Sequence, residues 1–202
     1  MRLGVFGGTF DPVHYGHLQL AESCRQELSL NEVRIIPAGS PPHKPGREIA
    51  DGHARADMVA LAVSGYPEFV VDRRELRRKG PSFTVETLEE LANENPDAEL
   101  FLLMGTDSLD EFPDWREPER IAQLSTVVAV NRPGHPLPQA EQLAARVGES
   151  LASQIRLMSR PGTDISASDL RDRIRRGDSI RFLTPRAVET FLTEHNLYAQ
   201  KL

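Results

Sequence analysis

The chain has 202 residues, of which 39% are hydrophobic, and its formal net charge is -6 at pH 7. This length supports one sizeable core, and the acidic balance argues against a general nucleic-acid coat or a polybasic membrane anchor. Cys24 is the single cysteine, which excludes a disulfide framework or a cysteine-based zinc cluster within one chain. The apolar runs are too short to span a bilayer. We expect a soluble, cytoplasmic protein without nucleic-acid or membrane partners.

Short apolar runs alternate with segments of helical periodicity along the whole chain. Strands are predicted at residues 3–6, 32–39, 69–76, 99–107, 126–134 and 155–159. Helices are predicted at residues 18–28, 54–66, 83–95 and 166–177, with a last one from residue 184. Ser82 or Thr84 is expected to cap the helix at 83–95. The proline-rich segment 40–48 is a loop, and on composition it is a candidate lid.

This alternation predicts an α/β protein with a doubly wound, Rossmann-like parallel sheet and helices on both faces. We expect one domain over residues 1–202, with a small C-terminal helical part, about 166–202, that packs on the sheet. Ligands of such folds bind at the carboxyl ends of the strands, where strand order reverses. The candidate site therefore combines residues 7–14, 37–44, 104–107 and 131–134 with residues 165–171.

The first strand-to-helix turn carries the most chemistry. Gly7 and Gly8 allow close approach of a ligand and dihedral angles that other residues resist. The following helix start offers backbone N–H groups to a phosphate, and His14 and His17 share one helical face. The alternatives are a structural turn with a capping histidine, or a metal site for which Asp11 is the one nearby carboxylate. A dinucleotide-dependent oxidoreductase is disfavoured, because the G-x-G-x-x-G pattern is absent.

Residues 8–17, GTFDPVHYGH, resemble the G-x-F-D-P-x-H-x-G-H signature of the nucleotidyltransferase superfamily, and ISASDLR (165–171) resembles its second signature. Within that superfamily the chain is similar to the bacterial nicotinate-nucleotide adenylyltransferases. The blocks that carry this resemblance are PAGSPPHK, ELRRKGPSFTVETL, LMGTDSLDEFPDW, NRPG and the closing P-x-x-V, in the same order. The chain departs from the usual family residues at Thr9, Phe83 and Ala167.

The resemblance implies transfer of an adenylyl group from ATP to nicotinate mononucleotide. The products are nicotinate adenine dinucleotide (deamido-NAD) and pyrophosphate, on the route to NAD. It also implies Mg²⁺ bound mainly through the ATP phosphates, with no protein residue assigned as a metal ligand. An enzyme that uses nicotinamide mononucleotide, or both mononucleotides, is the alternative, and a nucleotide sensor without activity is a third possibility. Monomer and homo-oligomer both remain open.

The resemblance also assigns roles to individual residues. The catalytic residues are His14, His17, Lys44 and Arg171. ATP is bound by Gly7, Gly8, Thr9, Phe10, His17, Gly105, Asp107, Arg132, Ile165, Ser166 and Arg171. Nicotinate mononucleotide is bound by Gly8, Thr9, His14, Lys44, Thr84 and Trp115. The residue types alone also allow structural interpretations. Lys44 could be an ordinary exposed lysine, Asp107 could cap a helix and Trp115 could belong to the core.

Overall fold

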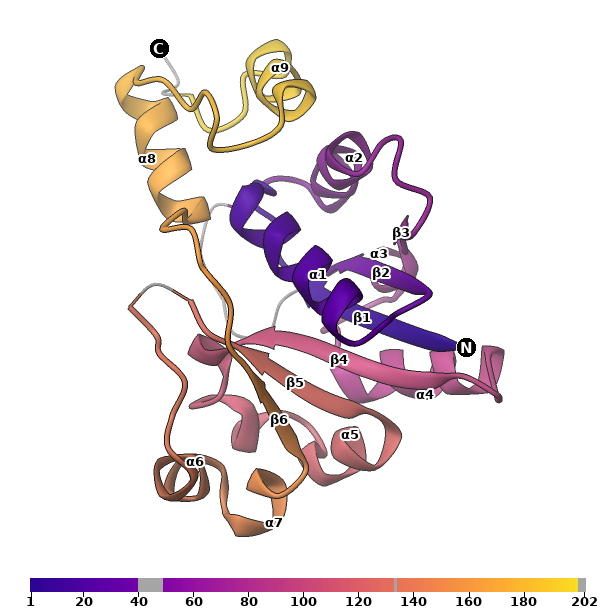
Figure 1. Ribbon diagram of the computed structural model, residues 1–202. Coiled ribbons are helices and arrows are strands. Elements are labelled where there is room, and N and C mark those ends of the chain that lie inside the picture. The colour runs from indigo at the N-terminus through magenta and orange to yellow at the C-terminus, as the bar shows by residue number, and fades with distance from the viewer. Residues whose placement is uncertain (40–48, 133, 200–202) are drawn as a thin grey trace.

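The computed structural model describes residues 1–39, 49–132 and 134–199. One parallel sheet with strand order β3-β2-β1-β4-β5-β6 forms the centre of the molecule (Figure 1). This confirms the predicted doubly wound α/β fold, since the order reverses between β1 and β4. The strands are β1 (Arg2–Gly8), β2 (Glu32–Pro37), β3 (Phe69–Val71), β4 (Glu99–Gly105), β5 (Thr126–Val130) and β6 (Ile155–Met158).

Helices connect the strands and cover both faces of the sheet (Figure 1). In the described parts of the chain, none of them is both long and apolar enough to cross a membrane. The helices are α1 (Tyr15–Glu27), α2 (Gly52–Ala62), α3 (Arg74–Arg77), α4 (Thr84–Glu94), α5 (Pro118–Leu124), α6 (Ala140–Val147), α7 (Glu149–Ala152), α8 (Ala167–Arg176) and α9 (Arg186–Glu194), with 3-10 turns at Thr106–Ser108 and Phe112–Asp114.

Two hydrophobic clusters lie on opposite faces of the sheet. Leu103 of β4 belongs to the cluster that includes the buried faces of α1 and α2. Its neighbour Leu102 belongs to the other cluster, together with Leu88 and Leu91 of α4. Successive side chains of a strand point to opposite faces, so the unbroken apolar run in β4 supplies both cores. This explains why the strand contains no polar residue between Leu100 and Met104.

The predicted strand at residues 69–76 is wrong in its second half. β3 ends at Val71, and α3 follows at Arg74. The carboxylate of Asp72 accepts hydrogen bonds from the backbone N–H of Arg74 at 2.9 Å and from its guanidinium Nε at 2.8 Å. A side-chain acceptor that satisfies an N–H at a helix start favours a helical turn. The sequence prediction also omitted α5, α6 and α7.

The two C-terminal helices follow the predicted boundaries, and α9 lies on the helix layer. α9 packs against α2, and Val188 and Leu192 join the cluster on the α1–α2 side. Just before α9, the Thr184 hydroxyl donates to the backbone carbonyl of Val13 at 2.8 Å. The C-terminal part therefore adds a further layer over α2 and supports the turn that precedes α1.

We predict that Leu103→Ala lowers the free energy of unfolding by about 2–5 kcal/mol, because Leu103 is 1% exposed and its loss leaves a cavity under α1. Chemical denaturation followed by circular dichroism measures this change. Leu61→Ala is the matched control, since Leu61 is 38% exposed. Equal effects of the two substitutions would contradict the assigned position of Leu103.

Candidate active site

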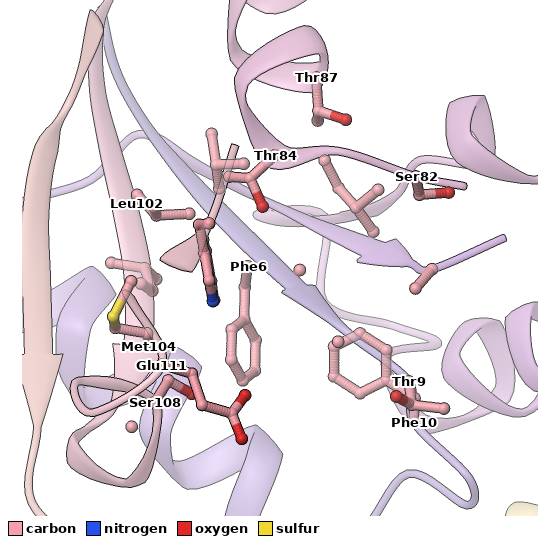
Figure 2. Close-up of a pocket in the computed structure, with 18 of the residues that line it drawn as sticks. Phe6, Thr9, Phe10, Ser82, Thr84, Thr87, Leu102, Met104, Ser108 and Glu111 are labelled. Carbon is pink, nitrogen blue, oxygen red and sulfur yellow. The ribbon is translucent and has the colours of Figure 1, made fainter. Parts of the chain in front are cut away.

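A cleft of about 550 Å³ opens at the carboxyl ends of β1 and β4, where the strand order reverses. Figure 2 shows Thr84, Ser82 and Thr87 along one side and Phe6, Thr9 and Phe10 along another. The cleft brings together ten of the predicted site residues, which come from five separate parts of the chain. They are Gly7, Gly8, Thr9, Phe10, His17, Thr84, Gly105, Asp107, Trp115 and Arg132.

The two glycines of the opening turn are needed for space, and the prediction of unusual dihedral angles is wrong. Both form the extended end of β1, and the left-handed backbone belongs to Phe10, with φ of 50°. A Cβ at Gly8 would lie 2.8 Å from the Phe10 ring, whereas a Cβ at Gly7 would meet nothing within 4 Å. Gly8 therefore makes room for Phe10, and Gly7 leaves the cleft open beside the backbone.

The His17 ring is held by aromatic neighbours. Its centroid lies 5.1 Å from that of Phe10 and 3.7 Å from that of His14. The backbone N–H of His14, the N-cap of α1, donates to His17 Nδ1 at 3.3 Å. A neutral imidazole whose Nδ1 accepts a hydrogen bond carries its proton on Nε2. His17 therefore combines the two predicted uses of a histidine here, because it helps to cap α1 and offers a donor to the cleft.

His14 lies behind His17 and is 1% exposed. Burial, with the positive charge of Arg132 as a second cause, lowers the pKa of His14 from 6.5 to about 3. A charged imidazole in this position would lack solvation and would be stacked directly on another ring. His14 is therefore neutral at pH 7, and no described residue bonds to its buried Nδ1.

Gly105, Asp107 and Arg132 form the wall opposite the opening turn. Arg132 Nη1 donates to Asp107 Oδ2 at 2.9 Å. A Cβ at Gly105 would lie 2.2 Å from the Asp107 carboxylate and 2.8 Å from Arg132 Cδ, so only glycine leaves room for this ion pair. Asp107 lies inside the 3-10 turn, whose N-cap is Gly105. The helix-cap interpretation of Asp107 is therefore wrong.

At the other end of the cleft, Thr84 is the first residue of α4 and Trp115 follows the second 3-10 turn. The prediction that Ser82 or Thr84 caps α4 is wrong, because the N-cap is Phe83 and, among the described residues, no side chain caps the helix. The first turn of α4 therefore keeps its backbone donors for other acceptors. Trp115 packs edge-on against Phe112, with ring centroids 5.5 Å apart, and also lines the cleft.

The predicted residues of the second signature lie beside the opening turn and are absent from the cleft lining. Arg171 Nη1 donates to the backbone carbonyl of Asp11 at 2.6 Å and lies 3.6 Å from Asp11 Oδ2. Ser166 caps α8 by accepting from the N–H of Asp169 at 3.1 Å. Ile165 is 9% exposed and belongs to the α1-side cluster. Lys44 and the candidate lid at 40–48 lie outside the described residues.

Arg55, which the sequence analysis did not select, holds the cleft together from behind. Arg55 is 2% exposed, and its guanidinium group donates to the carbonyls of Thr9 at 2.7 Å, Ala38 at 2.7 Å and Ala50 at 2.9 Å. These bonds join the segments that follow β1 and β2 to the segment before α2. Helical spacing places Arg55 on one face with Met58, Val59 and Ala62, a signal that could have revealed its burial.

Asp11 is a second buried charged residue that the sequence prediction did not select. It is 4% exposed, and its Oδ1 accepts from the Tyr198 hydroxyl at 2.5 Å and from the Ala50 N–H at 3.0 Å. Burial raises the pKa of Tyr198, and the hydrogen bond of its hydroxyl to Asp11 adds to that rise. Asp11 thus ties the opening turn to the C-terminal segment. The described residues contain no group of three or more potential metal ligands.

The fold and the cleft are those of an α/β nucleotidyltransferase. The cytidylyltransferase-like family model matches residues 5–173. Two solved structures of the Plasmodium falciparum nicotinic acid mononucleotide adenylyltransferase, complexed with NaAD and with APC, match the fold with TM-scores of 0.80 and 0.77. In both cases the identity is 15%; the alignments cover 98% of this chain and 97% and 96% of those chains.

Closer sequence relatives narrow the assignment. A protein of Thermomicrobium roseum named "Probable nicotinate-nucleotide adenylyltransferase" is 44% identical, over 98% of this chain and 91% of its own length. A Thermus thermophilus protein of the same name is 40% identical, over 98% of this chain and 100% of its own. The chain belongs to the cytidylyltransferase-like family and, within it, to the nicotinate-nucleotide adenylyltransferases, as the sequence motifs predicted.

We predict that the His14 ring does not titrate between pH 5 and pH 8. Its pKa of about 3 lies below the ordinary 6.5, so its contribution to stability is fully present above pH 6.5. As the pH falls from 6.5 towards 3, the unfolded chain binds the proton first and this contribution is lost. NMR of the imidazole resonances, assigned by comparison with His14→Gln, measures the titration. A midpoint near 6.5 in the folded protein would contradict the described burial.

Proposed function

We propose that the chain transfers an adenylyl group from ATP to nicotinate mononucleotide and releases pyrophosphate. The observation that carries this proposal is the arrangement at the start of α1, where His17 and the open backbone at Gly7 line one cleft with Thr84 and Trp115. One end of that cleft suits phosphates, and the other suits a flat ring with a carboxylate. Family membership supports the same reaction.

The reaction is an in-line attack by the 5′-phosphate of the mononucleotide on the α-phosphorus of ATP. The attacking phosphate oxygen forms the new P–O bond while the bond to the pyrophosphate oxygen breaks. The attacking group is already an anion, so the protein needs no nucleophile of its own. Its task is to align the groups and to stabilise the negative charge that spreads over the transferring phosphoryl group.

Three features of the opening turn suit that task. The N-terminus of α1 directs its positive dipole end at the phosphates, and Gly7 leaves space for a phosphate beside the backbone. His17 Nε2–H is a neutral donor that is already oriented by His14 and Phe10. We assign His17 to the α-phosphate, with His14 as its support, and Arg132 to the ATP side of the cleft through its pair with Asp107.

The mononucleotide end combines a ring platform with backbone donors. We assign Trp115 to stacking against the pyridine ring, since aromatic rings pair favourably in an offset-stacked arrangement. The uncapped first turn of α4 offers N–H groups to the carboxylate. A site built for the anion disfavours the amide, because an amide leaves the donors poorly matched. Ser166 and Arg171 are proposed to bind the outer phosphates of ATP, and Lys44, which lies outside the described residues, is proposed to bind the mononucleotide.

A magnesium ion is proposed to arrive with ATP. Because the described residues offer no cluster of three metal ligands, the phosphates themselves would supply most of its coordination, which is the usual mode for Mg²⁺ with nucleotides. The ion would neutralise phosphate charge. We further propose a cytoplasmic location, supported by Cys24, which is a buried free thiol.

We predict pyrophosphate release with ATP and magnesium when nicotinate mononucleotide is the second substrate, and much slower release with nicotinamide mononucleotide. The physical reason is the carboxylate site at the start of α4. Parallel assays with both mononucleotides measure the preference. Comparable rates with both mononucleotides would contradict carboxylate recognition, and no turnover by folded, ATP-binding protein would favour a nucleotide sensor.

We predict that His17→Ala lowers kcat by on the order of 10²–10³, the usual effect of removing one donor to the transition state. Steady-state kinetics at saturating substrate measures the loss. His53→Ala is the control, because His53 lies in the first turn of α2 outside the cleft lining. A His17 variant that folds normally and keeps nearly full kcat would refute the assigned role.

A further inference from the structure

A buried carboxyl group lines the mononucleotide end of the cleft and takes no part in the mechanism above. Glu75 of α3 is 7% exposed and is one of the cleft residues. An acidic side chain is unexpected beside a site proposed to bind a carboxylate, because two like charges repel. The surroundings of Glu75 indicate what it does there.

Glu75 lies close to side chains on both sides of the α4 N-terminus. Its Oε1 accepts from the Thr87 hydroxyl at 2.7 Å, and the nearby Ser82 hydroxyl, like that of Thr87, lowers the pKa of the carboxyl group against the larger effect of burial. Arg78 donates to the Thr87 hydroxyl at 2.8 Å. Ser82 precedes Thr84 by two residues, and Thr87 follows it by three. The carboxyl group therefore bridges the first turn of α4 (Figure 2 labels Ser82, Thr84 and Thr87).

The same cluster is locked to the end of β2. The Gly39 N–H donates to the Ser82 hydroxyl at 3.2 Å. A Cβ at Gly39 would lie 2.3 Å from the backbone carbonyl oxygen of Glu75, so α3 and the β2 end are in close contact. Burial raises the pKa of Glu75, while the Thr87 hydroxyl and the charge of Arg78 oppose that rise. Nearby donors thus compensate the carboxyl group, as a structural acceptor requires.

We propose that Glu75 is a positioning residue for the mononucleotide. It holds the uncapped first turn of α4 so that the backbone N–H groups near Thr84 meet the substrate carboxylate. This inference rests on the proposed function, since it names the residue that aligns the carboxylate site. Glu75 is thereby assigned to the mononucleotide end of the cleft. On the ATP side, Asp107 and Arg132 form their own ion pair.

The test compares KM for the two substrates. Glu75→Ala should raise KM for nicotinate mononucleotide roughly tenfold or more, as expected when a buried hydrogen-bond partner is lost, and should leave KM for ATP nearly unchanged. Glu75→Gln keeps the shape and one acceptor oxygen and should restore most of the wild-type value. Glu89→Ala is the matched control, because this half-exposed α4 carboxylate pairs with Arg120 away from the cleft lining.

A second variant keeps the test decisive if Glu75→Ala does not fold. Thr87→Val removes one hydroxyl at nearly constant volume and should give the same selective rise in KM. Quenching of the fluorescence of Trp115, the single tryptophan, measures mononucleotide binding without turnover.

Equal changes in KM for both substrates, or no change in KM in either variant, would overturn the inference. A lower KM for nicotinate mononucleotide in Glu75→Gln would also overturn it, since the charge would then be repulsive. Wild-type protein that neither binds nor uses this mononucleotide would instead remove the proposed function.

Discussion

The cleft depends on one buried cation. The guanidinium group of Arg55 donates to backbone carbonyls that follow β1 and β2 and precede α2. Parallel strands leave their last carbonyls without sheet partners, and a loop that must stay open to a ligand has few side chains to satisfy them. A single planar guanidinium group with five donors satisfies backbone carbonyls of three segments at once. The ends of β1 and β2 are thereby held without filling the space in front of Gly7.

The same constraint explains the electrostatics of the opening turn. Arg55 is 2% exposed, and burial lowers the pKa of its guanidinium group. The charge of Asp11, in the same polar cluster, opposes that shift. Asp11 is in turn satisfied by Tyr198 and the Ala50 N–H. The buried charges behind the turn are therefore balanced and bonded, as buried charges must be. The part of the cleft beside the opening turn then presents neutral donors, namely His17 and backbone N–H groups, and the proposed contact of these groups with a phosphate carries no high desolvation cost.

Much of this arrangement could be predicted from the sequence, because the responsible residues are local to one motif or to one strand end. The apolar run of β4 and the helix after His14 follow from periodicity and from short-range chemistry. The carboxyl-end rule for parallel sheets then brought Gly7, Asp107 and Arg132 to one place. Motif resemblance added Thr84 and Trp115, whose types alone are equally compatible with a structural role.

The parts that sequence reasoning missed depend on contacts between distant segments. Asp11 and Tyr198 are 187 positions apart, and Gly39 and Ser82 are 43 apart. No periodicity reports such pairs. The Asp72 side chain competed with the strand propensity of its neighbours and produced α3, and without α3 the position of Glu75 could not be foreseen. Local propensity is a weak guide wherever a single side-chain hydrogen bond decides between strand and helix.

The position of Arg171 shows how the motif residues and the distant contacts act together. Its Nη1 is bonded to the Asp11 carbonyl, beside the carboxylate that Tyr198 and Ala50 already engage. A guanidinium group has donors to spare beyond these contacts, so Arg171 can remain anchored to the opening turn while its other N–H groups face an anion. Anchoring of this kind reduces the rotamer entropy that a long side chain loses on binding. Tyr198 and Arg171 thus both bind Asp11, so the C-terminal segment helps to fix the opening turn to which Arg171, the proposed phosphate-binding residue, is anchored.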